Sequence, residues 1–503
     1  MGSPTPGGGL EGGMTMRSTT VPSGSRSRWL ALVVLCAGML MIVLDATIVN
    51  VALPSIQRDL GFSQSSLAWV VNAYLIPFGG LLLLAGRLGD LIGRKRIFVA
   101  GLVVFTAASM ACGLSVSQQM LVTARLVQGV GGAMTSTVIL GVIVTMFPGS
   151  REQARAIGVF SFTAAAGGSI GLLAGGVFTQ AVNWHWIFFV NLPIGIVAVA
   201  LALRLLESER GIGLREGADV VGAFLVTAAL MLGVYTIVEA RDFGWTSAHT
   251  LGLGAVAAML MAGFVVRQAT APNPLLPLGL FRSRNVSGAN VVQVLLVAGM
   301  FGMFFMGALY LQRVLGYDPM RIGLAFMPVA IVIGALSFRY SARLNTRFGA
   351  RAVLLVGLTM IAAGLALFAR APVGASYVVD VLPSMVLMGF GGGLSFPAVM
   401  TLGMSGATAD DSGLVSGLVN TTAQVGGSLG LAVLATLATS RTDHLLASGQ
   451  SAQAALTGGY HLAFAVAAGL VVVAIVVAAG VLRSEAPAAT GETAETATSR
   501  EAA

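Results

Sequence analysis

The sequence predicts an all-α protein that crosses a membrane many times. Three observations indicate this: the composition, the long uncharged runs and the placement of the basic residues. Of the 503 residues, 56% are hydrophobic and only 10% are charged, whereas soluble domains carry roughly 25% charged residues. Most of the uncharged runs reach the length of about 20 residues that a helix needs to span a bilayer. These runs are 29–44, 60–86, 126–150, 156–203, 285–312, 412–440 and 444–482.

The basic residues indicate the topology. The net charge of +8 would suit a nucleic-acid partner, but the arginines lie scattered between apolar runs and form no continuous patch, so we expect no nucleic acid. If Met1 lies inside and the spans alternate, most basic residues fall in the inside segments, as the positive-inside rule requires. The run 156–203 must hold two spans, because Trp184 and Trp186 at its midpoint prefer the membrane boundary. We expect about fourteen spans and two cytoplasmic termini.

The second half of the chain repeats the first. Residues 342–349 repeat the charged turn 86–93, residues 426–431 repeat the Gly-Gly-Ser-x-Gly-Leu of residues 167–172, and residues 389–392 repeat the glycines of 129–132. Parallel repeats are typical of transporters whose halves rock about a central site. The predicted organisation is a disordered N-terminus 1–28, a six-helix bundle 29–206, two additional helices 207–270, a six-helix bundle 271–483 and a disordered tail 484–503. The tails are poor in large apolar residues and cannot build a core.

Asp45 lies at the far end of the first apolar run, in Leu44-Asp45-Ala46-Thr47-Ile48-Val49-Asn50. An ionised Asp at mid-membrane costs about 2.5 to 3.5 kcal/mol, so such an acid either faces an aqueous path or is protonated part of the time. A group that can do both is a proton carrier. The alternative is that Asp45 merely bonds Thr47, Asn50 or a neighbouring helix.

Residues 86–96 form a charged turn after the second span. Gly86 and Gly93 permit a sharp chain reversal. Asp90 could bond a helix N-terminus or an arginine, with Arg94 as a candidate, and so hold two helices together in one state only. We expect these four residues to form a cytoplasmic gate. The alternative is a positive-inside anchor.

Arg125 lies about six residues, roughly 9 Å, inside the fourth span. Its depth matches that of Asp45, and a buried arginine needs a partner, so we expect the two to share one polar pocket and couple proton binding to movement. The alternative is that Arg125 snorkels to the outer interface. The second half lacks this charged set, because Met385, Thr346 and Ala350 match Arg125, Asp90 and Arg94.

The fifth span is rich in glycine, with Gly167, Gly171, Gly175 and Gly176 in one stretch. Such spacing leaves one helix face nearly free of side chains, so that another helix can pack closely and slide or pivot there. Ordinary tight packing is the alternative. Glycine spacing does not separate the two interpretations.

We also expect a substrate cavity between the halves. Its candidate residues are Asn50, Gln128, Met303 and Phe304. Met and Phe suit a pliable pocket for varied apolar ligands. The alternative for Met303 and Phe304 is that they face lipid.

Several other kinds of site are excluded or not expected. Lys95 is the only lysine and Arg94 precedes it, so no phosphate-binding G-x-x-x-x-G-K-[ST] loop exists and the chain does not hydrolyse ATP by that route. The histidines lack metal-ligand spacing, and no nucleophile, base and acid share one predicted surface. Cys36 and Cys112 lie in separate apolar runs, so no disulfide is expected. We expect neither an enzyme nor a cofactor or metal.

These motifs resemble one family. Residues 44–54 resemble the first-span signature of the fourteen-span drug:proton antiporters of the major facilitator superfamily, and residues 86–96 are similar to its loop after span two. Residues 125–132 resemble its fourth-span motif, and residues 167–176 its antiporter motif. Residues 184–195 and 310–312 look like further family sequence. The resemblance covers about residues 29–483.

The resemblance implies a major facilitator fold of two six-helix bundles and export of amphipathic drugs or antibiotics against proton entry. It assigns proton coupling to Asp45 and Arg125, and gating to the turn after span two. Two positions depart from the family pattern, Leu172 for a proline and His185 for an arginine. The Arg-rich, Ala-rich composition indicates a GC-rich genome, so we expect a bacterial cell membrane. We also expect a monomer. The rival is a proton-coupled symporter that takes up a small metabolite.

Overall fold

The computed structural model describes residues 25–63, 65–147, 150–207, 211, 213, 217–405 and 412–483, and these residues form helices joined by short turns. The predicted tail 484–503 and most of the tail 1–28 lie outside the described residues. Residues 25–28 were expected in the N-terminal tail, but they already belong to the first helix.

The described part of the first half contains seven α-helices, one of them a single turn, and the short 3-10 helix Ser66–Ala68. The α-helices are α1 (Ser25–Leu60), α2 (Trp69–Ile92), α3 (Arg94–Gly113), α4 (Gln118–Met146), α5 (Ser150–Ala181), α6 (Trp186–Phe189) and α7 (Asn191–Leu205). The one-turn helix α6 follows directly on Trp184 and His185, where the sequence predicts a boundary between two spans. The predicted division of the run 156–203 into two helices is therefore confirmed.

Two helices follow as an insertion, and the second half comes after them. The inserted pair is α8 (Val220–Phe243) and α9 (Ala248–Thr270). The second half consists of α10 (Arg284–Arg313), α11 (Pro319–Arg339), α12 (Ser341–Phe348), α13 (Ala350–Phe368), α14 (Leu382–Met404), α15 (Ser412–Ala447) and α16 (Ala452–Val481). Side chains of Ser117, Asp219, Ser247, Ser283, Asp318 and Ser451 cap helix N-termini by accepting a backbone N–H.

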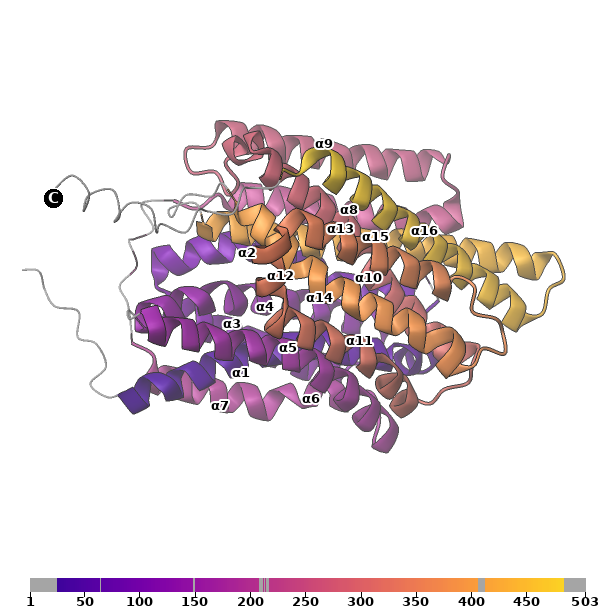
Figure 1. Ribbon diagram of the computed structural model, residues 1–503, viewed down its shortest axis with the longest axis horizontal. Coiled ribbons are helices and arrows are strands. Elements are labelled where there is room, and N and C mark those ends of the chain that lie inside the picture. The colour runs from indigo at the N-terminus through magenta and orange to yellow at the C-terminus, as the bar shows by residue number, and fades with distance from the viewer. Residues whose placement is uncertain are drawn as a thin grey trace, which may run out of the picture.

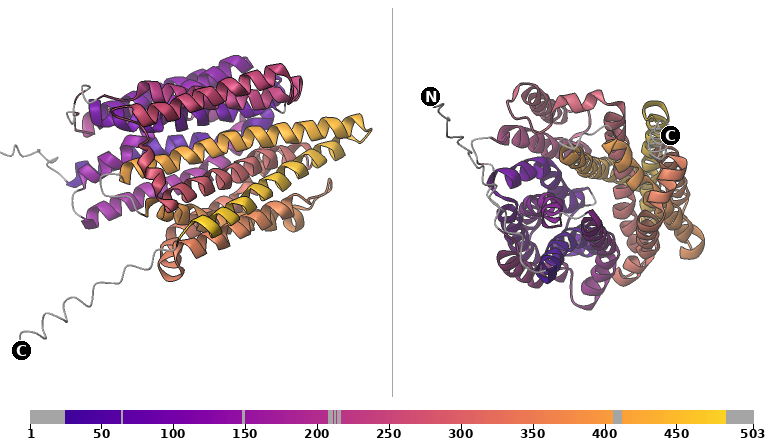
Figure 2. Two further views of the ribbon diagram at one scale, coloured as in Figure 1. Left: turned by 90° about the horizontal axis from the view of Figure 1, so that it is seen from above. Right: turned by 60° about the vertical axis from the view of Figure 1, so that its left-hand side comes forward.

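The packing of the helices repeats between the halves. In the first half α1 packs on α5, α2 on α4 and α3 on both α4 and α7; in the second, α10 packs on α15, α11 on α14 and α13 on both α14 and α16. Figure 2 shows the first half in indigo to purple beside the second half in orange to yellow. The halves meet where α5 packs on α11 and where α2 packs on α15. The duplication that the sequence predicts is therefore visible in the packing.

The inserted pair lies at the edge of the bundle, where α9 runs along the rim (Figure 1). Helix α8 contacts both α2 and α15, one from each half. Ile76 of α2, Val234 of α8 and Ala432 of α15 lie in one buried apolar cluster. The insertion therefore covers one of the two seams between the halves.

The lengths of the helices suit a membrane. Thirteen helices within the described residues are long and apolar enough to cross one. Helix α5 has 32 residues, and its described apolar stretch is Ile170–Ala181. With α5 included, the arrangement agrees with the fourteen or so spans that the sequence predicts.

We call the end of the bundle that carries Arg94, Lys95 and Arg96 the basic end. There α2 ends at Ile92 and α3 begins at Arg94, so Gly93 alone makes the turn, with φ +113°. The sequence predicts a chain reversal at both Gly86 and Gly93, and this is wrong for Gly86, because α2 continues as a helix past it. Gly349 makes the matching turn in the second half, with φ +80°.

Candidate functional site

A buried ion pair joins α1 to α4. The Asp45 side chain is 0% exposed and the Arg125 side chain 1%, and Arg125 Nη1 donates a hydrogen bond to Asp45 Oδ2. Arg125 therefore does not reach the membrane interface, and the snorkelling alternative is wrong. The structure brings together the two residues that the sequence places at equal depth.

Two amides complete the surroundings of the Asp45 carboxylate. Gln128 Nε2 donates to Asp45 Oδ1 at 2.8 Å, and Asn191 Nδ2 donates to the same oxygen at 3.4 Å. Ser109 Oγ accepts from both amides, at 3.1 and 2.9 Å, and donates to the carbonyl of Phe188 at 3.2 Å. Four helices, α1, α3, α4 and α7, thus contribute to one polar cluster.

The Arg125 guanidinium is held on several sides. Its Nε donates to the carbonyl of Val70 at 2.9 Å, and its Nη1 also donates to Gln128 Oε1 at 2.8 Å. Its central carbon lies 4.4 Å from the centre of the Tyr74 ring, close enough for a cation–π contact. The alternative partners of Asp45 bond elsewhere: Thr47 Oγ1 donates to the carbonyl of Val43 and Asn50 Nδ2 to that of Ala46.

Such a cluster is costly to bury and sensitive to change. Taking two charges out of water carries a large desolvation penalty, which their attraction and additional hydrogen bonds offset. Removing one partner leaves an uncompensated charge in the interior. If Arg125 moved away, a proton bound to Asp45 would neutralise the remaining charge. The arrangement can therefore link one proton to the relative position of α1 and α4.

The glycines of α5 lie against the helix that carries Asp45. A Cβ on Gly175 would approach the Ile48 carbonyl oxygen to 2.7 Å, and one on Gly171 would approach the Thr47 hydroxyl to 2.0 Å and the Leu44 carbonyl to 3.0 Å. Gly167 faces Val43 and Leu40 in the same way. Close packing on α1 is what the glycine spacing predicts.

Gly176 faces the other half of the molecule. A Cβ there would lie 2.9 Å from the Pro319 carbonyl oxygen of α11, and one on Gly323 of α11 would lie 2.6 Å from the Leu172 carbonyl oxygen of α5. Helix α5 is continuous through Leu172, the position where the family pattern has a proline. The glycines thus let α5 contact α1 and α11 at backbone distance.

The charged turn contains a second ion pair. Arg94 Nη2 lies 3.1 Å from Asp90 Oδ1, with side chains 33% and 47% exposed. Arg94 Nη1 donates to the Gly141 carbonyl at 3.2 Å and to Thr145 Oγ1 at 3.1 Å, both in α4. Gly89, one turn before Gly93, sits against Val138 of α4. The turn therefore ties α2 and α3 to α4 at the basic end.

The four candidate cavity residues have different surroundings. Gln128 belongs to the Asp45 cluster, Asn50 is 7% exposed, and Met303 is fully buried in the core. The Phe304 ring lies 5.5 Å from the ring of Phe326 in α11. The substrate cavity stays a prediction.

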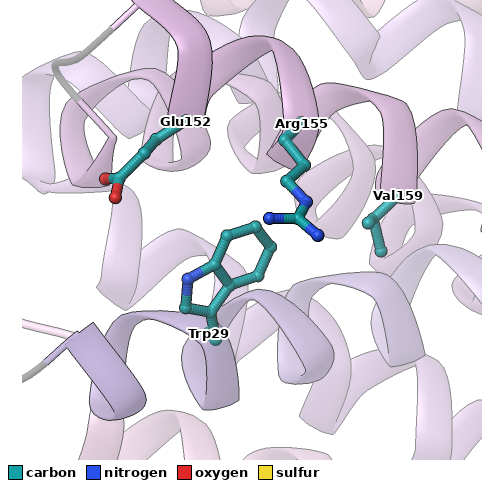
Figure 3. A pocket seen from close by; sticks show the side chains of 4 residues that line it. All are labelled: Trp29, Glu152, Arg155 and Val159. Atoms are coloured by element: carbon teal, nitrogen blue, oxygen red, sulfur yellow. The ribbon is translucent and has the colours of Figure 1, made fainter.

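Two open hollows lie at opposite ends of the first half. One, of about 530 Å³, is lined by Trp29 of α1 and by Glu152, Arg155 and Val159 of α5 (Figure 3). The other, of about 520 Å³, is lined by Ser55, Arg58, Asp59, Thr179, Val182, Asn183, Trp184 and His185. Trp184 Nε1 donates to Asp59 Oδ2 at 2.8 Å and so joins α1 to the turn before α6.

Sequence reasoning missed Asn191 and Ser109. Both are fully buried and both serve the Asp45 carboxylate, Asn191 directly and Ser109 through the two amides. The available signal was an amide inside the apolar run 186–203. Such a residue needs a partner in a membrane, and a charge at similar depth is the natural choice.

Comparisons with known proteins agree with this fold. Residues 35–431 match the Major Facilitator Superfamily. The chain is 36% identical to the puromycin resistance protein pur8 of Streptomyces alboniger, over 92% of this chain and 93% of that protein. It is 37% identical to the cephamycin export protein CmcT of Amycolatopsis lactamdurans, over 82% of this chain and 85% of that protein.

Solved structures show the same architecture at low identity. The nucleoside transporter NupG matches with a TM-score of 0.63 and 13% identity, over 90% of this chain and 100% of that one. A bacterial homologue of the human lysosomal transporter Spinster, inward-facing and unoccupied, matches with a TM-score of 0.62 and 17% identity, over 92% and 100%. The matched residues, the relatives and the paired bundles lead to one conclusion: the chain belongs to the major facilitator superfamily.

Proposed function

We propose that this protein is a secondary active exporter of amphipathic drugs or antibiotics, driven by proton antiport through alternating access. The observation that carries the proposal is the fully buried Asp45 carboxylate, held by Arg125, Gln128 and Asn191. The relatives include antibiotic resistance and export proteins, which supports drugs or antibiotics as the cargo. We place the protein in a bacterial plasma membrane as a monomer, with the basic end and both termini in the cytoplasm.

The proposed cycle rests on competition between proton and cargo. Cargo binds from the cytoplasm between the halves, at the predicted cavity of Asn50, Gln128, Met303 and Phe304. A proton from outside reaches Asp45 and weakens its ion pair with Arg125. Loss of that pair frees α1 to shift against α4. The glycine face of α5 carries no side chains that would block movement of α1 or α11 along it.

The turn at Gly93 acts as the cytoplasmic gate in this proposal. Asp90 and Arg94 fix α2 and α3 to α4 in the conformation of this structure, and the contact breaks when the cytoplasmic end changes position. Both side chains are partly exposed, so the contact is weak enough to break in each cycle. A proton entering at a membrane potential of 100 mV supplies roughly 2.3 kcal/mol, and a tenfold gradient of a neutral drug needs about 1.4 kcal/mol.

Inverted vesicles with an acidic lumen test the proposal. Adding a candidate drug, with puromycin as the first probe, should release protons from the lumen, measured as recovery of a pH-sensitive fluorophore. Asp45→Asn should abolish this release. Asp318→Asn is the matched control, because it makes the same change at an exposed helix cap and should keep full release. Release from Asp45→Asn equal to that of the control would overturn the assignment of Asp45.

The direction of flux separates the rival uptake mechanism. An antiporter accumulates labelled drug in inverted vesicles while protons leave the lumen. A symporter would carry the proton and the solute out of the lumen together. Measuring drug and proton on the same vesicles therefore decides between export and uptake.

A further inference from the structure

A hydrogen bond between two side chains joins α1 to α10 at the end opposite the basic end. Arg313, the last residue of α10, donates through Nη2 to Oε1 of Gln57 near the end of α1. Gln57 is 6% exposed, and its own Nε2 donates to the Phe62 carbonyl at 3.0 Å. The Gln57 amide is thus fixed by the turn that follows α1, with its oxygen offered to the second half.

Gln57 and Arg313 occupy neighbouring positions in the duplicated halves, because Gln57-Arg58-Asp59-Leu60-Gly61 is repeated as Gln312-Arg313-Val314-Leu315-Gly316. Gly61 and Gly316, which end these two segments, both have φ +70°, so Gln312 is the equivalent of Gln57 and Arg313 follows it by one residue. Parallel repeats are related by an axis that runs along the membrane normal. Two groups that touch each other and lie within one residue of equivalence in the repeat must both lie close to that axis, so this bond sits near the centre of the bundle end.

Other contacts at this end lie away from the axis, on α5 and α11. The Met320 backbone N–H donates to Gln180 Oε1 at 3.2 Å, and Gly176 faces the Pro319 carbonyl. They hold the halves together along one seam. The Gln57–Arg313 bond is different, because it crosses the line along which cargo must leave if the halves rock apart.

We infer that Gln57 and Arg313 form the exit gate, a side-chain bond across the transport axis that closes the outer end and must break before cargo leaves. The inference rests on the proposed alternating access, but it concerns neither proton coupling nor cargo identity. A neutral amide suits this task, because a charge-assisted bond to an amide can break in each cycle. A carboxylate at residue 57 would form an ion pair and hold the gate closed for longer.

The test is the rate at which a membrane-impermeant maleimide labels Leu53→Cys. Leu53 is fully buried one turn below Gln57 on α1, and the proposal requires that opening the gate exposes it. Arg313→Gln should raise the labelling rate several-fold, whereas Gln57→Glu should lower it several-fold. Arg321→Gln removes an exposed arginine at the same end and should leave the rate unchanged. The protein without the Leu53 change gives the background from Cys36 and Cys112, both buried.

Two further arrangements keep the result decisive. Val49→Cys, two turns below Gln57 and also buried, repeats the comparison in case the first reporter misfolds. Right-side-out and inverted vesicles are both labelled without drug or proton gradient, so a reversed orientation shows as labelling from the other side. Equal rates in Arg313→Gln, Gln57→Glu and the Arg321→Gln control, or a shift of both gate variants in the same direction, would overturn the gate. Failure of Asp45→Asn to stop proton release would overturn the proposed coupling alone.

Discussion

The Asp45 carboxylate and the Arg125 guanidinium, 80 residues apart in the chain, form an ion pair in which neither side chain is more than 1% exposed. Removing one partner of a buried pair costs about 3 to 5 kcal/mol, because the other charge is left without compensation. We therefore expect Arg125→Ala to lower the thermal midpoint of the purified protein sharply. Arg321→Ala, at a 69% exposed site, should change stability by about 0.5 kcal/mol or less.

A double variant separates the pair from general damage. Asp45→Asn combined with Arg125→Gln removes both charges and keeps polar groups at both positions. The combined loss of stability should be smaller than the sum of the two single losses, because neither charge is left alone. Strictly additive losses would show that the two residues are not energetically coupled.

The glycine face of α5 predicts a position-dependent effect of one methyl group. Gly175→Ala places a Cβ 2.7 Å from the Ile48 carbonyl oxygen, and backbone cannot rotate away. Overpacking of this kind typically costs about 1 to 3 kcal/mol. Transport should fall as well, because α1 must move apart from α5 to relieve the contact. Drug efflux from cells and thermal unfolding measure the two effects.

Gly168→Ala is the matched control on the same helix, since a Cβ there meets nothing within 4 Å. Alanine favours a helix over glycine by up to about 1 kcal/mol, so this variant should be as stable as the original or more stable. A Gly168→Ala variant that loses as much transport as Gly175→Ala would indicate that helix flexibility, and not close packing, is what the glycines provide.

Sequence alone predicts the fold because membrane spans impose a simple requirement. Each span needs about 20 apolar residues, and the lipid allows few alternatives to a helix. The same reasoning predicts that Asp45 and Arg125 meet, because a buried charge needs a partner and only a few charges lie at that depth. The chain does not reverse at Gly86, because a glycine inside a helix weakens it without ending it, and α2 continues to Ile92.

Uncharged polar residues are harder to assign. Thr47 and Asn50 bond carbonyls of their own helix, as Thr and Asn in a membrane often do, whereas Asn191 and Ser109 bond across helices. The residue types do not distinguish these two cases, because a Ser, Thr or Asn side chain can form its hydrogen bonds either within its own helix or with a neighbouring helix. The choice depends on which face of the helix meets a neighbour, and that is set by packing.

The inserted helices contain a carboxylate whose ionisation should stabilise the protein. Asp219 caps α8, and its side chain is 1% exposed. Burial raises the pKa of this carboxyl, but hydrogen bonds from the Gly222 backbone, Arg267 and Gln268 outweigh that effect and hold the pKa below its usual value. A depressed pKa stabilises the fold at pH values above the unfolded pKa, and this contribution is lost as the pH falls through the folded one.

We therefore expect Asp219→Asn to be less stable than the original protein at pH 7, with the difference shrinking as the pH falls below about 4, where the unfolded carboxyl becomes protonated. Thermal unfolding in detergent across this range measures it. Asp318→Asn makes the same acid-to-amide change at an exposed cap and is the matched control for the substitution itself. A difference for Asp219→Asn that grew toward low pH would contradict the sign derived from the hydrogen bonds.

The turns at Gly93 and Gly349 allow the effect of the Asp90–Arg94 ion pair on transport to be separated from the effect of backbone strain. Both residues have positive φ, +113° and +80°, with ψ of 129° and 139°, and a residue other than glycine in such a conformation costs roughly 1 to 3 kcal/mol. Gly93→Ala and Gly349→Ala should therefore each lower stability by a similar amount. Only the first turn carries the Asp90–Arg94 pair, because Thr346 and Ala350 stand at the matching positions.

If that pair acts as a gate, Gly93→Ala should reduce the rate of efflux far more than Gly349→Ala. Arg94→Ala should do the same with a stability loss of about 1 kcal/mol or less, since its ion pair is partly exposed. Initial rates of drug efflux, normalised to the amount of folded protein, measure both. Equal loss of rate in Gly93→Ala and Gly349→Ala would mean that the charges at the first turn serve only to orient the protein in the membrane, because strain alone would then account for the effect.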